Sequence, residues 1–254
     1  MLSTLIFTVA LSVSTVLGLP SGTTTPSEFS KRAPQVITSC TKDKTAALTF
    51  DDGPHWFVYD VSKTLLANDA KGTFFFNGDN FGCIYTEDQA KRVKYAYDKG
   101  HQVASHTWAH ANLTTLNWDQ IHHQFWLMEE ALEKITGAYP AFARPPYGAY
   151  NQQVLDAAAI RGQSIVNWDF DSGDSAGLTA QQSIQRYKDV AEITKPKSVL
   201  ALNHDTYQTT AQVVLPEAIK ALKGAGYKLV TVAECLGMAP YQRVSAPKPR
   251  DVSC

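Results

Sequence analysis

The stretch Thr49-Phe50-Asp51-Asp52-Gly53-Pro54 offers a first approach to both the fold and the chemistry of this chain. The apolar run Ala46-Ala47-Leu48 before it is typical of a buried strand, and Gly53-Pro54 predicts a turn. Two adjacent carboxylates therefore stand at the end of a strand. Because carboxylates this close repel each other, a useful arrangement would have one bind a metal ion while the other transfers protons. The alternative is a pair of turn-forming aspartates, which are common at strand ends.

The rest of the chain alternates between strand-like and helix-like patterns. Strand-like runs cover residues 46–50, 73–76, 102–105, 142–144, 164–168, 199–203 and 228–231. Helix-like stretches cover residues 58–67, 87–99, 118–135, 152–160, 180–193 and 213–222. This alternation predicts an α/β fold with a parallel sheet, closed as a barrel or wound open. No repeat, low-complexity tract or linker interrupts residues 40–235, so we expect one domain with about seven parallel strands.

The two ends of the chain carry signals of secretion. Residues 1–18 are apolar with small residues before the expected cleavage point, as in a signal peptide, and are too short and too interrupted by Ser and Thr for a membrane anchor. Residues 19–32 form a polar pro-segment that ends in the dibasic pair Lys31-Arg32, which leaves residues 33–254 as the mature domain. The C-terminus has no apolar tail for a lipid anchor. We therefore expect a secreted protein with no membrane anchor.

Charge and cysteine content narrow the class further. The net charge of −1 provides no basic field, so nucleic acid is not an expected partner. Four cysteines in a secreted chain favour two disulfides, for which three pairings are open. Cys40 and Cys235 flank the first and last strand-like runs, which would be neighbours in a closed barrel. We therefore expect Cys40–Cys235 together with Cys83–Cys254.

Polar residues follow the strand-like runs in a regular way. They are Asp51 and Asp52 after the first run, His106 and His110 after the third, Arg144 at the end of the fourth, Asp171 and Asp174 after the fifth, and His204-Asp205 after the sixth. Polar groups at the carboxyl ends of parallel strands form the active-site rim of a (β/α) barrel. The pattern therefore predicts an active site at this rim.

The two histidines of this rim are four residues apart, which would put both on one face of a helical turn. Two histidines and one aspartate make a three-ligand site for a divalent ion, with open positions for water and substrate. A zinc protease of the His-Glu-x-x-His type needs Glu directly after the first histidine. Thr107 occupies that position, so this class is excluded.

Four ordered motifs resemble those of a known family. They are Thr49-Phe50-Asp51-Asp52-Gly53-Pro54, His106-Thr107-Trp108-Ala109-His110, Arg144-Pro145-Pro146-Tyr147 and Leu202-Asn203-His204. In this order they resemble the motifs of polysaccharide deacetylases, carbohydrate esterase family 4, and the chain looks most like the fungal chitin deacetylases. The similarity spans residues 40–236. It implies a distorted (β/α) barrel and metal-dependent removal of N-acetyl groups from β-1,4-linked N-acetylglucosamine in chitin or chitooligosaccharides, with release of acetate.

The resemblance also implies a metal centre. By position, Asp51 matches the catalytic base, while Asp52, His106 and His110 match the metal ligands. Because this set supplies only nitrogen and oxygen ligands, we expect one divalent ion, Zn²⁺ in the first place and Co²⁺ as the alternative.

The remaining roles follow from the same resemblance. Arg144 would orient the base, and His204, tuned by the carboxylate of Asp174, would be the general acid. Tyr147 would donate its backbone N–H to the oxyanion, and Leu202 would line the pocket for the acetyl methyl group.

The sequence departs from the family pattern in one motif and leaves alternatives open. The family's Asp-x-x-Asp-Trp appears here as Asp171-Ser172-Gly173-Asp174 followed by Ser175, so one aromatic wall of the substrate groove is missing unless Trp168 or Phe170 replaces it. Asn112-Leu113-Thr114 is the one N-glycosylation sequon. We expect a monomer that acts outside the cell or in the cell wall. The alternatives are a deacetylase of another glycan, such as acetylxylan, and a non-catalytic chitin-binding protein on the same scaffold.

Overall fold

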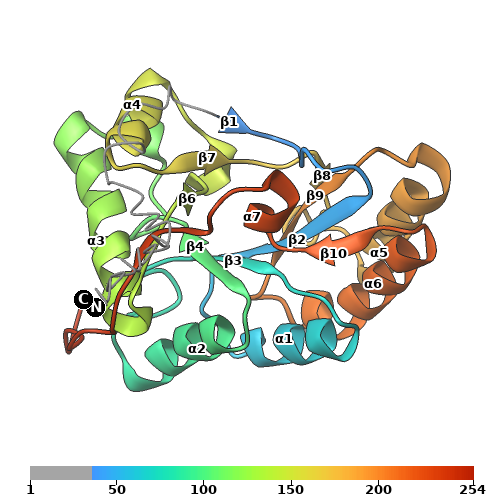
Figure 1. The fold of residues 1–254 in the computed structure, drawn as a ribbon, viewed down its shortest axis with the longest axis horizontal. Coiled ribbons are helices and arrows are strands. Elements are labelled where there is room, and N and C mark those ends of the chain that lie inside the picture. The colour runs from blue at the N-terminus through green and yellow to red at the C-terminus, as the bar shows by residue number, and fades with distance from the viewer. Residues whose placement is uncertain (1–35) are drawn as a thin grey trace, which may run out of the picture.

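The computed structural model of the chain describes residues 36–254, so the predicted signal peptide and pro-segment lie outside the described residues. A single sheet forms the centre of the molecule (Figure 1), and all of its strand pairs are parallel. Its strands, in spatial order, are β1 (Val36–Ile37), β7 (Ser164–Val166), β6 (Phe142–Ala143), β4 (Gln102–Ser105), β3 (Thr73–Phe76), β2 (Thr45–Asp51), β9 (Val199–His204) and β8 (Phe170–Asp171). A ninth strand, β10 (Lys228–Val230), pairs beside β2.

The sheet curls into a distorted barrel that stays open between its edge strands. Within the described residues no hydrogen-bonded pair joins β1 to β8. Strand β2 is the centre of the arrangement, because it pairs with β9 over most of its length, with β3 at its carboxyl end and with β10 at its amino end. The predicted single-domain barrel is thus confirmed. It has nine strands rather than about seven, because the two-residue strands β1 and β8 lie at its edges.

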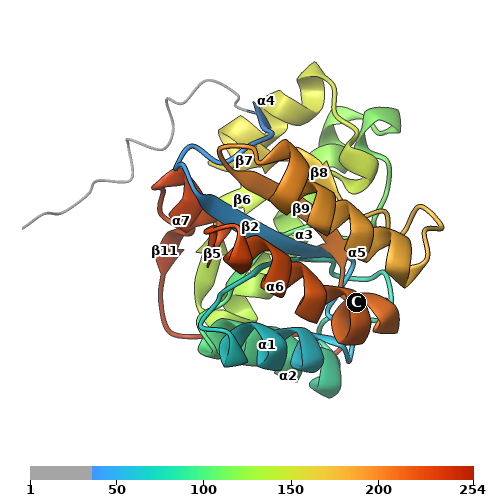
Figure 2. The ribbon, with the colours of Figure 1, turned by 90° about the vertical axis from the view of Figure 1, so that its right-hand side faces the viewer.

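Helices cover the outside of the sheet, and Figure 2 shows α1, α2, α5 and α6 lying against it. Their bounds are α1 Val58–Ala67, α2 Glu87–Asp98, α3 Trp118–Thr136, α4 Gln152–Ile160, α5 Ala180–Asp189, α6 Leu215–Gly224 and α7 Val232–Leu236. The side chain of Asn117 caps α3 by accepting the backbone N–H of Gln120. The helices expected at 180–193 and 213–222 each overlap a π-helical turn, Val190–Thr194 after α5 and Thr210–Val214 before α6.

The alternation of side chains along β2 divides the core into two parts. Leu48 and Phe50 belong to the apolar layer between sheet and helices, where the ring of Phe50 lies 5.3 Å from that of Phe74. Ala47 faces the interior of the barrel together with Phe75. The side chain of Asp51, four residues after Ala47 in the strand, is on that interior side by the same alternation. The strand therefore directs a carboxylate into the barrel.

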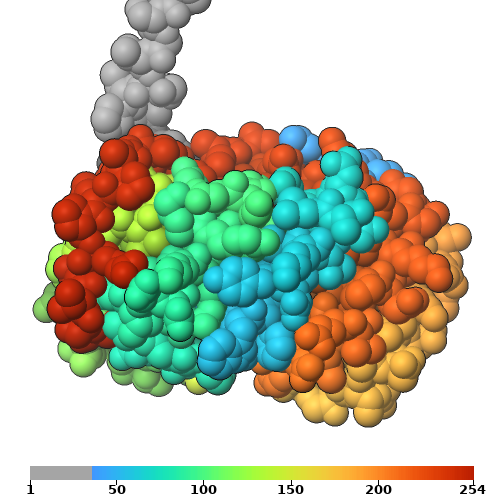
Figure 3. Space-filling view, turned by 90° about the horizontal axis from the view of Figure 1, so that it is seen from below, coloured from blue at the N-terminus to red at the C-terminus, as the bar shows by residue number. Residues whose placement is uncertain are grey.

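Both expected disulfides are present, Cys40–Cys235 beside the paired strands β2 and β10, and Cys83–Cys254. The second one ties the C-terminus to the loop between β3 and α2. A small antiparallel sheet of β5 (Ala138–Pro140) and β11 (Tyr241–Val244) holds the segment before the C-terminus, and the sequence pattern does not reveal this sheet. Figure 3 shows the C-terminal segment at the edge of the molecule beside α2. None of the helices in residues 36–254 is long and apolar enough to cross a membrane.

Candidate metal centre

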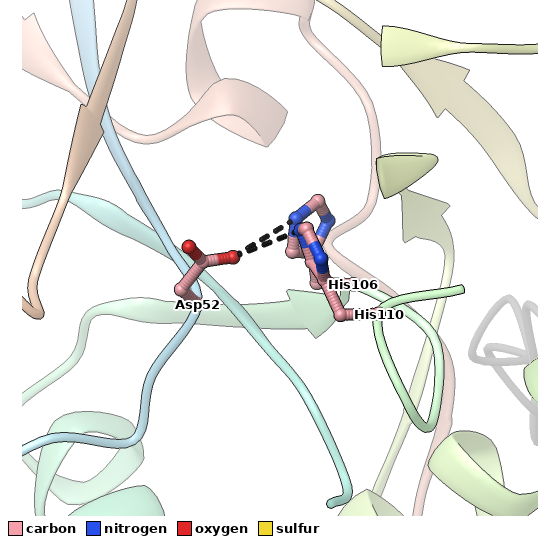
Figure 4. A group of neighbouring side chains, drawn as sticks. All are labelled: Asp52, His106 and His110. Atoms are coloured by element: carbon pink, nitrogen blue, oxygen red, sulfur yellow. Dashed lines mark ion pairs between the residues drawn. The ribbon is translucent and has the colours of Figure 1, made fainter. Parts of the chain in front are cut away.

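Three side chains meet at the carboxyl end of the sheet (Figure 4). Asp52 comes from the turn after β2, and His106 and His110 come from the loop after β4. Oδ1 of Asp52 lies 3.4 Å from Nε2 of His106 and 3.2 Å from Nε2 of His110. One ligand atom from each residue lies within 4.8 Å of the other two, so all three are close enough together to bind one metal ion.

The protonation and hydrogen bonding of this group fit a divalent metal ion. Nδ1 of His106 lies 2.8 Å from the carbonyl oxygen of Arg144 and donates its proton there, so Nε2 presents a lone pair toward Asp52. In the part of the chain that the structure describes, the buried Oδ1 of Asp52 has no hydrogen-bond donor. A buried acceptor without a donor, facing two imidazole nitrogens, is the arrangement that a metal ion would complete.

Electrostatics support the same ligand forms. Burial raises the pKa of Asp52, but the neighbouring His106 and His110 more than offset this, so the pKa is lowered overall. Burial lowers the pKa of His110, and the neighbouring His106 lowers it further. A carboxylate anion and a neutral imidazole are the forms that coordinate a metal ion.

The prediction that a helical turn carries the two histidines is wrong. His106 and His110 lie in an irregular loop in which Thr107 has φ 66° and His110 has φ 51°. Asn77 holds this loop from the end of β3, because its Nδ2 donates to the carbonyl oxygens of His106 at 2.6 Å and Thr107 at 3.1 Å. The two imidazoles therefore converge through a supported loop rather than through helical spacing.

Left-handed backbone conformations cluster at this centre. Among residues 36–254, seven non-glycine residues have positive φ, and four of them are at the site, namely Asp52 (72°), Thr107 (66°), His110 (51°) and Tyr147 (62°). Such conformations cost about 1–3 kcal/mol each and persist only where the surroundings hold them. This concentration of strain at one place indicates a site that is organised for function rather than for stability.

Asp51 lies beside the metal group in a buried ion pair with Arg144. Nη1 of Arg144 lies 2.8 Å from Oδ1 of Asp51 and 2.6 Å from Oγ1 of Thr49. The other guanidinium nitrogens donate to the carbonyl oxygens of Val166 at 3.0 Å and Asn167 at 2.9 Å. One oxygen of Asp51 is therefore fixed, while its Oδ2 lies 3.8 Å from Nε2 of His106.

His204 lies in the strand next to Asp51, and the two residues are register partners in β9 and β2. Nδ1 of His204 donates to Oδ1 of Asp174 at 2.8 Å, while Oδ2 of Asp174 accepts from the His204 backbone N–H and from Oγ1 of Thr210, each at 2.8 Å. Burial lowers the pKa of His204, but the hydrogen bond and charge of Asp174, with the charges of Asp51 and Asp52, raise it overall to about 9. The imidazole is thus held in its protonated form at neutral pH.

The other expected residues lie around this group. Tyr147 is 68% exposed, and its ring contacts the ring of His110 edge-on with the ring centres 4.8 Å apart. Leu202 lies two residues before His204 in β9, so both side chains are on the same face of the strand. Phe170 is buried with its ring 4.6 Å from that of Tyr187, whereas Trp168 is half-buried with its ring 5.5 Å from the guanidinium of Arg144.

Sequence reasoning missed the residues that support the site. Asn77 follows β3 at the carboxyl end of the sheet, so the same positional rule that found the histidines could have found it. Thr210 lies 36 residues after Asp174 in the chain and starts a π-helical turn, and no spacing or motif connects the two.

At the sequon, Oδ1 of Asn112 accepts from the backbone N–H of Thr114 at 3.1 Å and from its hydroxyl at 2.8 Å.

Comparison with known proteins places this arrangement in a family. The model of the polysaccharide deacetylase family matches residues 38–166. A chitin deacetylase of Pestalotiopsis sp. is 36% identical over 210 residues, 80% of this chain and 67% of that protein. A chitin deacetylase of Colletotrichum lindemuthianum is 32% identical over 227 residues, 87% of this chain and 92% of that protein. Two other curated relatives are longer, and the chain spans 46% and 54% of them.

The fold leads to the same relatives. The solved structure of the chitin deacetylase from Colletotrichum lindemuthianum superposes with a TM-score of 0.77 at 31% identity, covering 82% of this chain and 94% of that one. The match covers most of both chains, so the two proteins share the parallel-sheet barrel fold.

Proposed function

Because this chain belongs to the polysaccharide deacetylase family, carbohydrate esterase family 4, and is a hydrolase of the deacetylase class, we propose that it removes N-acetyl groups from chitin or chitooligosaccharides in a metal-dependent reaction. The single observation that carries the proposal is the position of Asp51. Its Oδ1 is tied to the buried guanidinium of Arg144, while its Oδ2 lies 3.8 Å from Nε2 of His106 in the metal group. A fixed base beside a metal ion is what hydrolysis of an amide needs.

Asp52, His106 and His110 would hold the metal ion, and their nitrogen and oxygen donors suit Zn²⁺ first and Co²⁺ as an alternative. Bound there, the ion would polarise the amide carbonyl and lower the pKa of the attacking water. His106 is oriented for this role by the carbonyl of Arg144, which accepts its Nδ1 proton at 2.8 Å.

The protein's own groups would move the protons. Asp51 would accept the proton of the attacking water, because Arg144 fixes its orientation and stabilises its charge. His204, protonated through its contact with Asp174, would donate a proton to the leaving amine of the sugar. The backbone N–H of Tyr147 would stabilise the oxyanion, and Leu202 would contact the methyl group of the acetyl.

The substrate assignment rests on the relatives and on the shape of the rim. The two disulfides and the predicted signal peptide support action outside the cell or in the cell wall. We infer that the protein acts as a monomer on an extended glycan. The metal group lies at the open rim of the barrel, and no second domain covers it among residues 36–254. An N-glycan at Asn112 would lie in the loop that follows the metal histidines.

The test is to incubate the purified protein with oligomers of N-acetylglucosamine, with and without a chelator, and to follow loss of acetyl groups by mass spectrometry. We expect deacetylation of the oligomers, loss of activity on chelation and recovery with Zn²⁺ or Co²⁺. Turnover of acetylxylan with no action on the oligomers would assign a different substrate. Binding of the oligomers without turnover in the metal-loaded protein would identify a non-catalytic binding protein.

A further inference from the structure

Three aromatic rings form an exposed surface on the two loops that follow β2 and β3, at the carboxyl end of the sheet that also carries the metal group. They belong to His55 and Trp56 in the loop between β2 and α1, and to Phe81 in the loop between β3 and α2, and we call them the aromatic shelf. The ring of His55 lies 5.5 Å from that of Trp56 and 6.3 Å from that of Phe81, so the three are continuous. Trp56 is 61% exposed and Phe81 is 58% exposed, which makes the shelf an apolar surface open to solvent.

Trp56 is held in place from beneath. The guanidinium of Arg92, a residue of α2 that is 7% exposed, lies 4.7 Å from the centre of the indole ring. Nη1 of Arg92 also donates to the carbonyl oxygen of Pro54 at 3.5 Å and to Oε1 of Gln89 at 3.2 Å. Nε2 of Gln89 in turn donates to the carbonyl oxygen of Phe81 at 3.1 Å. One buried pair on α2 therefore fixes both loops of the shelf.

Stability alone does not account for this arrangement. A buried arginine is normally paired with a carboxylate, because an unpaired buried charge is costly. In the described part of the chain Arg92 forms no ion pair, and its buried Nε has no hydrogen-bond partner. The charge is used instead to hold one face of an indole whose other side is exposed. A rigid aromatic face open to solvent is preorganised to bind a ligand ring.

The position of Trp56 limits its distance from the metal group. It follows the proposed metal ligand Asp52 by four residues, so the two Cα atoms lie within about 14 Å, the reach of four extended residues. Pyranose rings have apolar faces of C–H groups that stack on aromatic faces, and consecutive sugars of one chain would extend from the metal group past the rim. We propose that Trp56, braced by Arg92, stacks on a pyranose ring of the glycan outside the residue being deacetylated and thereby sets the preference for longer chains.

This inference rests on the proposed function only in taking a glycan chain as the substrate. It assigns to Trp56 a positioning role for a distant sugar, not a role in the chemical step. The consequence is specific, since a chain too short to reach the shelf gains nothing from it. Stacking therefore lowers KM for longer oligomers and leaves kcat at saturation unchanged.

The experiment compares Trp56→Ala and Trp56→Phe with the wild type in the metal-loaded full-length protein, using oligomers of N-acetylglucosamine from the dimer to the hexamer. Trp126→Ala is the matched control, because Trp126 is 44% exposed on α3 with its ring against that of His123 and has no buried cationic brace in the described residues. We expect Trp56→Ala to lower kcat/KM for the hexamer about tenfold through KM, as for loss of one aromatic stacking contact, and to leave the shortest active oligomer within about twofold. Trp56→Phe should keep most of the preference, and Trp126→Ala should match the wild type.

A second readout separates this inference from the proposed function. Binding of the hexamer to the same proteins is measured by calorimetry, which requires no turnover. Weaker binding to Trp56→Ala than to wild type, in a protein that does not deacetylate, would support the shelf and reject the enzyme. Equal binding and equal chain-length dependence in Trp56→Ala and wild type would overturn the inference while leaving the deacetylase intact. A loss that is the same for every chain length, or no binding of the hexamer to the wild type, would also overturn it.

Discussion

Nη1 of Arg144 lies 2.8 Å from Oδ1 of Asp51, and the two side chains are 0% and 3% exposed. The guanidinium also donates to the hydroxyl of Thr49 and to two backbone carbonyls, and these hydrogen bonds fix the geometry of the pair. Asp51 is thereby held as an oriented carboxylate whose second oxygen faces the metal group. The pair is a device for positioning the proposed base, and removing either partner leaves a charge buried without compensation.

Replacing Arg144 should therefore show strong coupling to Asp51. We expect Arg144→Met to lower the free energy of unfolding by about 3–5 kcal/mol, because it leaves the Asp51 carboxylate buried and unpaired. Asp51→Asn in the same chain should recover part of this loss, since it removes the unpaired charge. Urea denaturation of the two single variants and the double variant measures the coupling. Losses that simply add would contradict the account, because residues in contact are expected to interact.

The contact between Asp174 and His204 predicts a shift in the pH profile. Asp174 is the main group that raises the pKa of His204 to about 9, against the lowering effect of burial. In Asp174→Asn the pKa of His204 should fall, so the protonated acid is lost at lower pH and the alkaline limb of kcat/KM moves toward neutral pH. Thr210→Val removes only a hydroxyl that donates to the other oxygen of Asp174, and should shift the limb less. An unchanged alkaline limb in Asp174→Asn would exclude His204 as the group that sets it.

His101 predicts a loss of stability in acid that is independent of the active site. Its Nε2 lies 2.9 Å from Oγ of Ser62, and its Nδ1 accepts the backbone N–H of Gly72 at 3.2 Å. Burial, with the charge of Lys71, lowers the pKa of His101 from 6.5 to about 4. Below pH 6.5 His101 therefore binds a proton in the unfolded chain, whereas in the native state it binds one only near pH 4.

This group should therefore contribute stability above pH 6.5 that is lost as the pH falls toward 4. The loss is about 3 kcal/mol, at roughly 1.36 kcal/mol per pKa unit. In His101→Gln the free energy of unfolding should fall less steeply over this range, whereas His123→Gln, at an exposed position of α3, should follow the wild type. Unfolding curves with the same pH slope in all three proteins would rule out the contribution of His101.

The elements that the sequence predicts well are those with enough residues to show a period. Helices α1 and α4 have the predicted bounds, and the seven strand-like runs all lie in the parallel sheet. Strands β1 and β8 have two residues each, so they show no alternation and depend on their partners β7 and β9. The π-helical turn before α6 is equally hidden, because its residues continue the helical pattern of their neighbours.

For the site, the sequence predicts which residues follow which strand, but it does not predict the backbone conformation of the loops that carry them. Asp52, His106 and Arg144 follow their strands as the sequence indicates, because parallel strands gather their carboxyl ends at one rim. The convergence of His110 depends on left-handed backbone in a loop that Asn77 supports from another strand, which four-residue spacing does not encode. The exposure of Trp56 is also not readable from its sequence, since the neighbouring Phe57 is of the same apolar type and packs against the core.

The central claim is that adjacent aspartates have different tasks, with Asp51 as the base and Asp52 as the metal ligand. The most direct measurement is metal content and deacetylation rate, side by side, in Asp51→Asn and Asp52→Asn. We expect Asp51→Asn to retain the metal ion, because Asp52, His106 and His110 are untouched, and to lose about 10²–10⁴-fold in rate. Asp52→Asn should lose the metal ion and regain part of its activity at high metal concentration. An Asp51→Asn protein that deacetylates at the wild-type rate, or an Asp52→Asn protein that holds the metal ion as tightly as the wild type, would contradict the account.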